Sequence, residues 1–175
     1  GFNTDFEKID ISKNWSIYNK MVQNIIDKTK AENSIQFTDE IKKFNLIATG
    51  AISGGNCGKE HRFYDYDNKI SVVSKLKLMK GTDNISNYGS TIKVYFQSDN
   101  TEECMSFSSY VNTKLVRFLV FIGLCKLSIR DNLTWRFVPQ PEAFDHIFTD
   151  QELYDKYGLT EKEINIIESV IKERK

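Results

Sequence analysis

The chain has 175 residues, of which 40% are hydrophobic and 13% aromatic, and its 24 Lys and Arg side chains equal its 24 Asp and Glu side chains in number. This composition is too apolar for an intrinsically disordered protein, and the length suits one domain with at most a small appendage. A neutral net charge excludes bulk attraction to a polyanion, so contact with nucleic acid would need a local cluster of basic residues.

In the N-terminal half, one amphipathic helix and several strands are predicted. Apolar residues at three- and four-residue spacing predict a helix over residues 18–30. Residues 45–49 are typical of a buried strand, and they run directly into a glycine-rich loop at residues 50–58. β-branched, aromatic or alternating residues predict further strands at 62–66, 70–79 and 91–96. In the second of these, Val72, Leu76 and Leu78 are expected to face inward.

The C-terminal half is dominated by one apolar stretch. It predicts a helix over residues 102–127 with a break near Ser108 and Ser109, and its second half should be buried because it is apolar on nearly every side. Residues 135–138 predict a strand that is stopped by Pro139. Two short helices are expected at 150–157 and 161–172. Local signals mark their ends, namely the capping boxes Thr149–Glu152 and Thr160–Glu163 and the left-handed position of Gly158.

These elements predict an α/β or α+β fold in which a mixed sheet packs on a long central helix, with a C-terminal helical hairpin. The sheet is expected to contain the strands between residues 45 and 96 together with the segment 135–138. The expected division is a main domain over residues 1–145 and a two-helix tail over residues 146–175 that packs on it.

The cellular setting follows from the cysteines and the termini. Three widely spaced cysteines and a polar N-terminus without a signal peptide predict a cytoplasmic protein with free thiols. A membrane span needs ~20 apolar residues. Lys114, Arg117 and Lys126 interrupt the most apolar stretch, so no membrane partner is expected. Because the chain begins Gly1-Phe2 without a methionine, we expect a fragment of a longer protein.

The glycine-rich loop does not match a nucleotide-triphosphate site. Ser53 stands where the phosphate loop requires its first glycine, and Glu60 stands where it requires a hydroxyl. The loop still allows backbone amides and small polar side chains to approach a ligand closely. Asn56 in particular could bind an adenine edge through both groups of its carboxamide. The simpler interpretation is a plain surface loop.

Metal-dependent chemistry has weak support. Cys57 and His61 are four positions apart, but no second close pair of ligands exists for a zinc site. Glu40 and Lys42 form a Glu-x-Lys triplet with Asp27 and Asp39 upstream, and metal-dependent nucleases use clustered acids with a lysine. Such triplets also arise by chance in a chain rich in Lys and Glu.

Basic residues are unevenly distributed. From Lys42 to Lys80 there are eight basic residues against three acidic ones, whereas from Pro139 to the end nine acidic residues face five basic ones. Lysine and arginine bind phosphates without reading sequence. A phosphate-facing surface and ordinary solvated lysines both fit this pattern.

Three stretches carry a resemblance to a known family. They read Ser-Tyr-Val-Asn-Thr-Lys-Leu-Val-Arg-Phe-Leu-Val at 109–120, Trp-Arg-Phe-Val-Pro at 135–139, and Leu-Tyr-Asp-Lys-Tyr-Gly-Leu-Thr-Glu-Lys-Glu-Ile at 153–164. In these stretches the chain resembles the C-terminal region of adenine-specific DNA methyltransferases of type II restriction-modification systems. The resemblance spans about residues 90–172 and is poor before Asn45. The family's Pro-Leu-Gln-Asp-Phe is replaced here by Pro-Gln-Pro-Glu-Ala-Phe at 139–144.

The resemblance implies a target-recognition domain rather than an enzyme in its own right. In that family the catalytic domain, which binds S-adenosylmethionine, lies N-terminal to this region. The present chain has no Asn/Asp-Pro-Pro-Tyr stretch and therefore no matching catalytic residue. The expected partners are double-stranded DNA and the N-terminal catalytic domain of the same parent chain. No cofactor is expected in this fragment, and S-adenosylmethionine is expected in the parent protein.

The sequence therefore predicts a sequence-specific DNA-binding domain without catalytic or metal-binding residues. Its predicted DNA contacts are Ser53, Gly54, Gly55, Asn56, Lys59, Arg62, Lys75, Lys77 and Lys80. Two alternatives remain open, a metal-dependent nuclease that uses Glu40 and Lys42 with Asp27 or Asp39, and a protein-interaction or dimerisation module.

Overall fold

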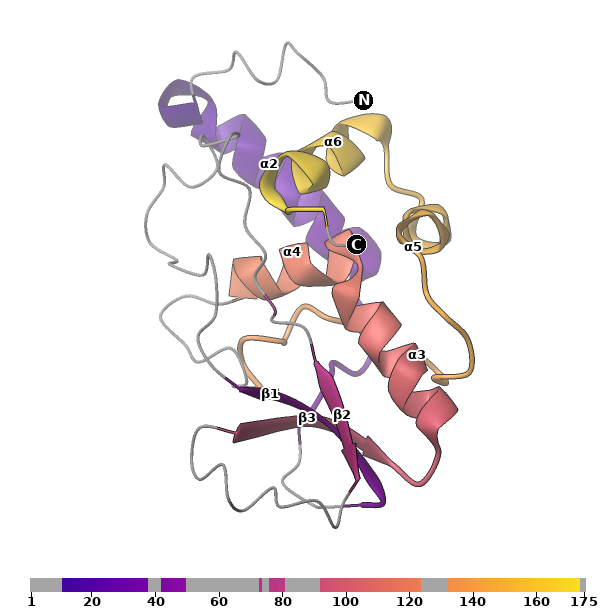
Figure 1. Ribbon diagram of the computed structural model, residues 1–175. Helices are drawn as coiled ribbons and strands as arrows, with labels where there is room; N and C mark the ends of the chain where they lie inside the picture. Colours follow the sequence, from indigo (N-terminus) through magenta and orange to yellow (C-terminus); the bar gives the residue numbers. More distant parts are fainter. Residues whose placement is uncertain are drawn as a thin grey trace.

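The computed structural model describes residues 11–37, 42–49, 73, 76–80, 92–123 and 132–173. Its elements are, in chain order, α2 (Ile11–Thr29), β1 (Phe44–Thr49), β2 (Lys77–Lys80), β3 (Ile92–Ser98), α3 (Thr101–Asn112), α4 (Lys114–Gly123), α5 (Asp150–Tyr157) and α6 (Glu161–Val170). In Figure 1 the sheet lies at one end, and α4 lies between it and the neighbouring helices α2 and α6. The α+β class predicted from the sequence is thus confirmed.

The described sheet has the strand order β2-β1-β3, and both of its pairings are antiparallel. Phe44 of β1 lies opposite Lys80 of β2 and opposite Ser98 of β3. These strands therefore differ from the mixed sheet that was expected, because β1 runs opposite to both of its neighbours. The predicted strand at residues 62–66 lies outside the described residues.

A β-bulge in β3 changes which side chains reach the core. Leu46 lies opposite Phe96, but the next residue of β1, Ile47, lies opposite Val94, so Tyr95 is the extra residue of the bulge. As a result two consecutive aromatic side chains face the helices. Tyr95 belongs to the main core and Phe96 packs against it.

The outer strand β2 buries a residue that was not expected to be buried. Met79 is 8% exposed and packs with Ile47 and Val94 in a small separate cluster. Leu78, which was predicted to face inward, is 37% exposed. The reason is that α3 packs on β1 and β3, so the face of β2 that carries Leu78 is left partly uncovered. Leu76 packs at the margin of the main core, and Val72 lies outside the described residues.

The central helix is broken at Thr113, later than the predicted position. Thr113 has extended backbone angles, its hydroxyl donates to the Tyr110 carbonyl at 2.7 Å, and its Oγ1 accepts from the Val116 amide. It therefore closes α3 and begins α4. Ser109 does not break the helix because its hydroxyl donates to the Ser106 carbonyl within α3. No helix among the described residues has the length and apolar character needed to cross a membrane.

The segment 135–138 was predicted as a strand of the sheet, and that prediction is wrong. It forms turns, with the Trp135 amide donating to the Asn132 carbonyl, and then pairs briefly with the segment after α2 through a bridge between Ser34 and Pro139. The aromatic core explains its position. The Trp135 ring is fully buried and packs edge-on against the Phe37 ring, with 5.0 Å between centroids.

The two tail helices begin and end almost where the local signals predicted. Gly158 has φ 60 and ψ 41, the left-handed conformation that glycine adopts without strain. The capping box Thr160–Glu163 is complete. At α5 only half of the predicted box forms, since Thr149 accepts from the Glu152 amide while the Glu152 carboxylate binds His146 Nε2 at 2.6 Å.

Candidate nucleic-acid interface

Of the predicted DNA contacts, the structure describes Lys77 and Lys80, and both side chains are exposed. They begin and end β2, and because strand side chains alternate they emerge on opposite faces of this outer strand. Their Cα atoms are roughly 10 Å apart at about 3.3 Å per strand residue. The remaining predicted contacts lie outside the described residues, namely Ser53, Gly54, Gly55, Asn56, Lys59, Arg62 and Lys75.

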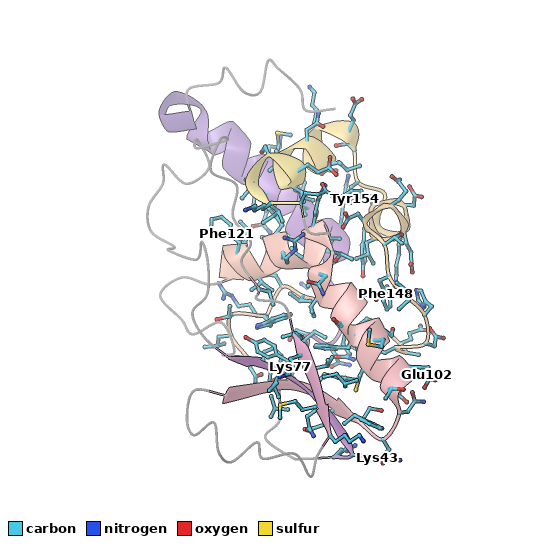
Figure 2. All side chains as sticks on the ribbon, in the orientation of Figure 1. Lys43, Lys77, Glu102, Phe121, Phe148 and Tyr154 are labelled. Atoms are coloured by element: carbon cyan, nitrogen blue, oxygen red, sulfur yellow. The ribbon has the colours of Figure 1, made fainter. Side chains whose placement is uncertain are left out.

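Two further lysines, which are not among the predicted DNA contacts, lie near the Lys80 end of β2. Lys42 and Lys43 immediately precede β1 and are exposed. They come close to the end of β2 because Phe44, the next residue, lies opposite Lys80. Figure 2 labels Lys43 and Lys77, which lie toward opposite ends of the sheet, with Lys77 at the end nearer to α4. We name Lys42, Lys43, Lys77 and Lys80 the lysine edge.

Several basic residues of the helical part are instead used inside the molecule. Lys28 forms an ion pair of 2.6 Å with Glu163. Lys114 pairs with Glu168 at 3.3 Å and with Glu173 at 2.7 Å. By contrast, among the described residues no ion pair joins Lys42, Lys43 or Lys77 to a carboxylate.

The stretch that carries the family resemblance is part of the internal scaffold. The buried hydroxyl of Tyr110 donates to the Pro139 carbonyl at 2.6 Å, and Ser109 Oγ accepts from the Phe148 amide at 2.9 Å. Arg117 is 1% exposed and donates to the carbonyls of Asn112 and Lys172. These side chains already have partners within the chain, so they are not positioned to bind DNA. The resemblance thus concerns residues that hold the fold together.

A cleft of about 250 Å³ lies beside the lysine edge, between β3 and the segments near residues 35 and 140. We name it the aromatic cleft, and its lining residues are Ile35, Gln36, Lys42, Tyr95, Phe96, Gln97, Phe107, Gln140 and Phe144. Gln97 is 9% exposed, and its Oε1 atom is buried without a hydrogen-bond partner. Asn45 lies directly opposite Gln97 in the sheet, and its Oδ1 atom is in the same situation.

A larger cleft, of about 380 Å³, lies between the end of α2 and residues 136–139. Asp27 and Lys30 are in its lining, and Asp27 accepts a hydrogen bond from Gln23. Lys42 lines the aromatic cleft instead, so Asp27 and Lys42 do not share a site. Glu40 and Asp39 lie outside the described residues, and the described ranges contain no group of three metal-ligating side chains.

The described cysteine is not a nucleophile. Cys104 is fully buried in α3, and burial together with the nearby Glu103 carboxylate raises the pKa of its thiol to about 11. The thiolate that nucleophilic chemistry requires is therefore scarce at neutral pH. Cys57, His61 and Cys125 lie outside the described residues.

Comparisons of the chain with models of known protein families, with characterised proteins and with solved structures find no significant match. The candidate interface therefore rests on the chemistry and position of its own residues and not on similarity to a known protein. It combines exposed positive charge along the outer strand with a partly aromatic cleft that shares Lys42. Such an arrangement can bind phosphates and planar rings.

Proposed function

We propose that this chain is a DNA target-recognition domain, and that it belongs to an adenine-specific DNA methyltransferase of a restriction-modification system. The observation that carries the proposal is the lysine edge. Its four lysines are exposed at the two ends of β2, whereas Lys28 and Lys114 form ion pairs between elements of the chain and Arg117 is buried. Exposed positive charge supplies the salt-dependent affinity on which DNA-binding proteins depend.

The lysine edge presents charge on both faces of β2. The Cα atoms of Lys77 and Lys80 are roughly 10 Å apart and their side chains emerge on opposite faces, so a DNA backbone that contacts both would pass across this strand. Lys77 lies opposite Ile47, near the end of β1 from which the chain continues into the glycine-rich loop. Contacts from the lysine edge to phosphates would therefore position the protein, and Ser53 and Asn56 of that loop would read base edges.

The chemistry of methyl transfer is assigned to the parent protein. In this proposal S-adenosylmethionine binds to an N-terminal catalytic domain of the parent, and the present chain selects the DNA sequence in the cytoplasm. The family resemblance supports this division, because the residues that carry it form the scaffold beneath the sheet rather than a reactive site.

The proposal is tested by measuring the binding of a short labelled DNA duplex by fluorescence anisotropy over a range of salt concentrations. Four phosphate contacts correspond to a log–log slope of about −3.6, and therefore to a loss of roughly 100-fold in affinity between about 50 and 200 mM salt. Absence of binding at low salt would overturn the proposal. Cleavage of the duplex with Mg²⁺ that is lost in Glu40→Ala would instead indicate the nuclease.

Lys77 and Lys80 also allow a purely structural interpretation, in which they keep the molecules apart rather than bind DNA. Lysine on an outer strand discourages edge-to-edge pairing between molecules. If this were the role of Lys77 and Lys80, their replacement would promote self-association and leave DNA affinity unchanged. Sedimentation velocity of the Lys77→Gln, Lys80→Gln variant separates the two roles.

A further inference from the structure

One wall of the aromatic cleft consists of phenylalanine rings, which have no role in the binding of phosphates by the lysine edge. The Phe96 and Phe107 rings are stacked face to face, with 4.5 Å between centroids and an angle of 6° between planes. The Phe144 ring meets both edge-on, at 5.2 and 5.3 Å. All three line the cleft, and because Phe107 is 1% exposed, the accessible surface comes from the partly buried Phe96 and Phe144 rings. Rings held in this way form a rigid apolar surface that suits a flat ligand.

The other walls of the cleft carry carboxamides. Gln36 and Gln140 are exposed, and both line the cleft together with the nearly buried Gln97. A carboxamide donates and accepts hydrogen bonds side by side, which matches the edge of a purine.

Lys42 completes the set, because its exposed side chain belongs to both the cleft and the lysine edge. Flat rings, carboxamides and an ammonium group are complementary to the base, the base edge and the phosphate of one nucleotide. The volume of about 250 Å³ is slightly below the range of about 300–1,000 Å³ for ligand pockets, which restricts the ligand to one small planar molecule.

We propose that the aromatic cleft binds a single nucleotide, with its base against the wall of phenylalanines, its polar edge on the glutamines and its phosphate on Lys42. This chemistry has two sources, a free mononucleotide or an unpaired nucleotide of a DNA strand held at the lysine edge. The second source rests on the proposed function, whereas the first does not.

The test uses the whole chain and two matched pairs of probes. Deoxyadenosine monophosphate is compared with deoxyribose 5-phosphate, which has no base, by isothermal titration calorimetry. A paired duplex is compared with the same duplex carrying one bulged adenosine by fluorescence anisotropy. Base stacking and edge contacts are expected to favour the probe with the accessible base by about tenfold in at least one pair.

Gln140→Trp is the variant that fills the cleft. The Gln140 side chain is exposed, and the main-chain hydrogen bond of 2.8 Å from its amide to the Asn33 carbonyl is kept, so the fold is retained. The preference for the base should be lost in this variant. Gln151→Trp, at an exposed position of α5, is the control and should keep the preference.

Each outcome separates this inference from the proposed function. No preference in either pair, or a preference that survives Gln140→Trp, overturns the nucleotide site, while binding of the paired duplex would still support DNA recognition. Binding of the mononucleotide without binding of any duplex supports the site and overturns DNA recognition. A preference only for the bulged duplex supports the site and identifies a DNA strand as its source.

Discussion

Arg117 Nη1 donates a hydrogen bond of 2.8 Å to the carbonyl oxygen of Lys172, 55 positions later in the chain. Through its Nε atom the same side chain also binds the carbonyl of Asn112, where α3 ends. One buried guanidinium thus joins the break between α3 and α4 to the segment after α6. A group this polar is stable in the core only because its donors are satisfied.

Replacing Arg117 should therefore destabilise the fold without touching the lysine edge. Arg117→Met leaves carbonyls of the α3 end and of Lys172 without a buried donor, which should lower the free energy of unfolding by about 2–4 kcal/mol. Urea denaturation measures the loss, and Lys162→Met, at an exposed position of α6, is the control. Duplex affinity of the folded variant should be unchanged; a large loss of affinity would place Arg117 at the DNA instead.

A second prediction concerns the close approach of α4 to the turn that follows it. A Cβ atom on Gly123 would lie 2.1 Å from the carbonyl oxygen of Thr134, which belongs to the backbone and cannot rotate away. Gly123→Ala should cost about 3 kcal/mol in unfolding free energy, the upper end for overpacking, because the clash is with backbone. Gly158→Ala provides a contrast, since it meets no atom within 4 Å and bears only the strain of φ 60, worth about 1 kcal/mol. Equal effects of the two substitutions would contradict this account.

A third prediction follows from the ion pair between α2 and α6. Burial alone would raise the pKa of Glu163, but hydrogen bonds from Lys28 and Thr160 outweigh it and hold the pKa of this carboxyl below its ordinary value. A carboxyl with a lowered native pKa stabilises the fold above its unfolded pKa, and this stabilisation is lost as the pH falls through the native value. Unfolding free energy should therefore drop in that acidic window. The drop should be smaller in Glu163→Gln, and an identical pH dependence would refute the link.

A fourth prediction has the opposite sign. Hydrogen bonds with Asp145 and Glu152, at 2.7 and 2.6 Å, raise the pKa of His146. The protonated imidazole thus stabilises the start of α5 below the unfolded pKa of about 6.5, and the contribution is lost as the pH rises through the native value. The stability difference between the wild type and His146→Asn should shrink between mildly acidic and mildly alkaline pH. A difference that grows over this range would contradict it.

The parts of the fold that were predicted correctly are those whose cause lies in neighbouring residues. Gly158 and Thr160 mark the ends of the tail helices because helix caps act over a few positions. The helix break was predicted near Ser109, but it lies at Thr113. The sequence shows that Ser109 is polar, but it does not show that the Ser109 hydroxyl is satisfied within the helix by the Ser106 carbonyl. The error at residues 135–138 has a similar origin, since the burial of Trp135 depends on Phe37, distant in the chain.

The candidate site was predictable only in part for the same reason. Lys77 was expected on an outward-facing position, and its exposure agrees with that. Lys42 was considered only for nuclease chemistry, since nothing local indicates that β1 brings it close to the end of β2. Asp27 was considered with it, yet the two residues line different clefts. Strand register and long-range packing decide these relationships, and single-sequence patterns do not contain them.

The central claim is that the lysine edge binds DNA phosphates, and the salt dependence of duplex affinity tests it most directly. The decisive variant replaces all four of its lysines with glutamine. A control variant replaces four other exposed lysines and gives the same change in net charge. They are Lys20 in α2, Lys30 directly after it, Lys156 in α5 and Lys162 in α6. The slope of log affinity against log salt should become shallower by about 0.9 per lysine in the first variant and should remain unchanged in the second. Equal slopes in the two variants would contradict the claim.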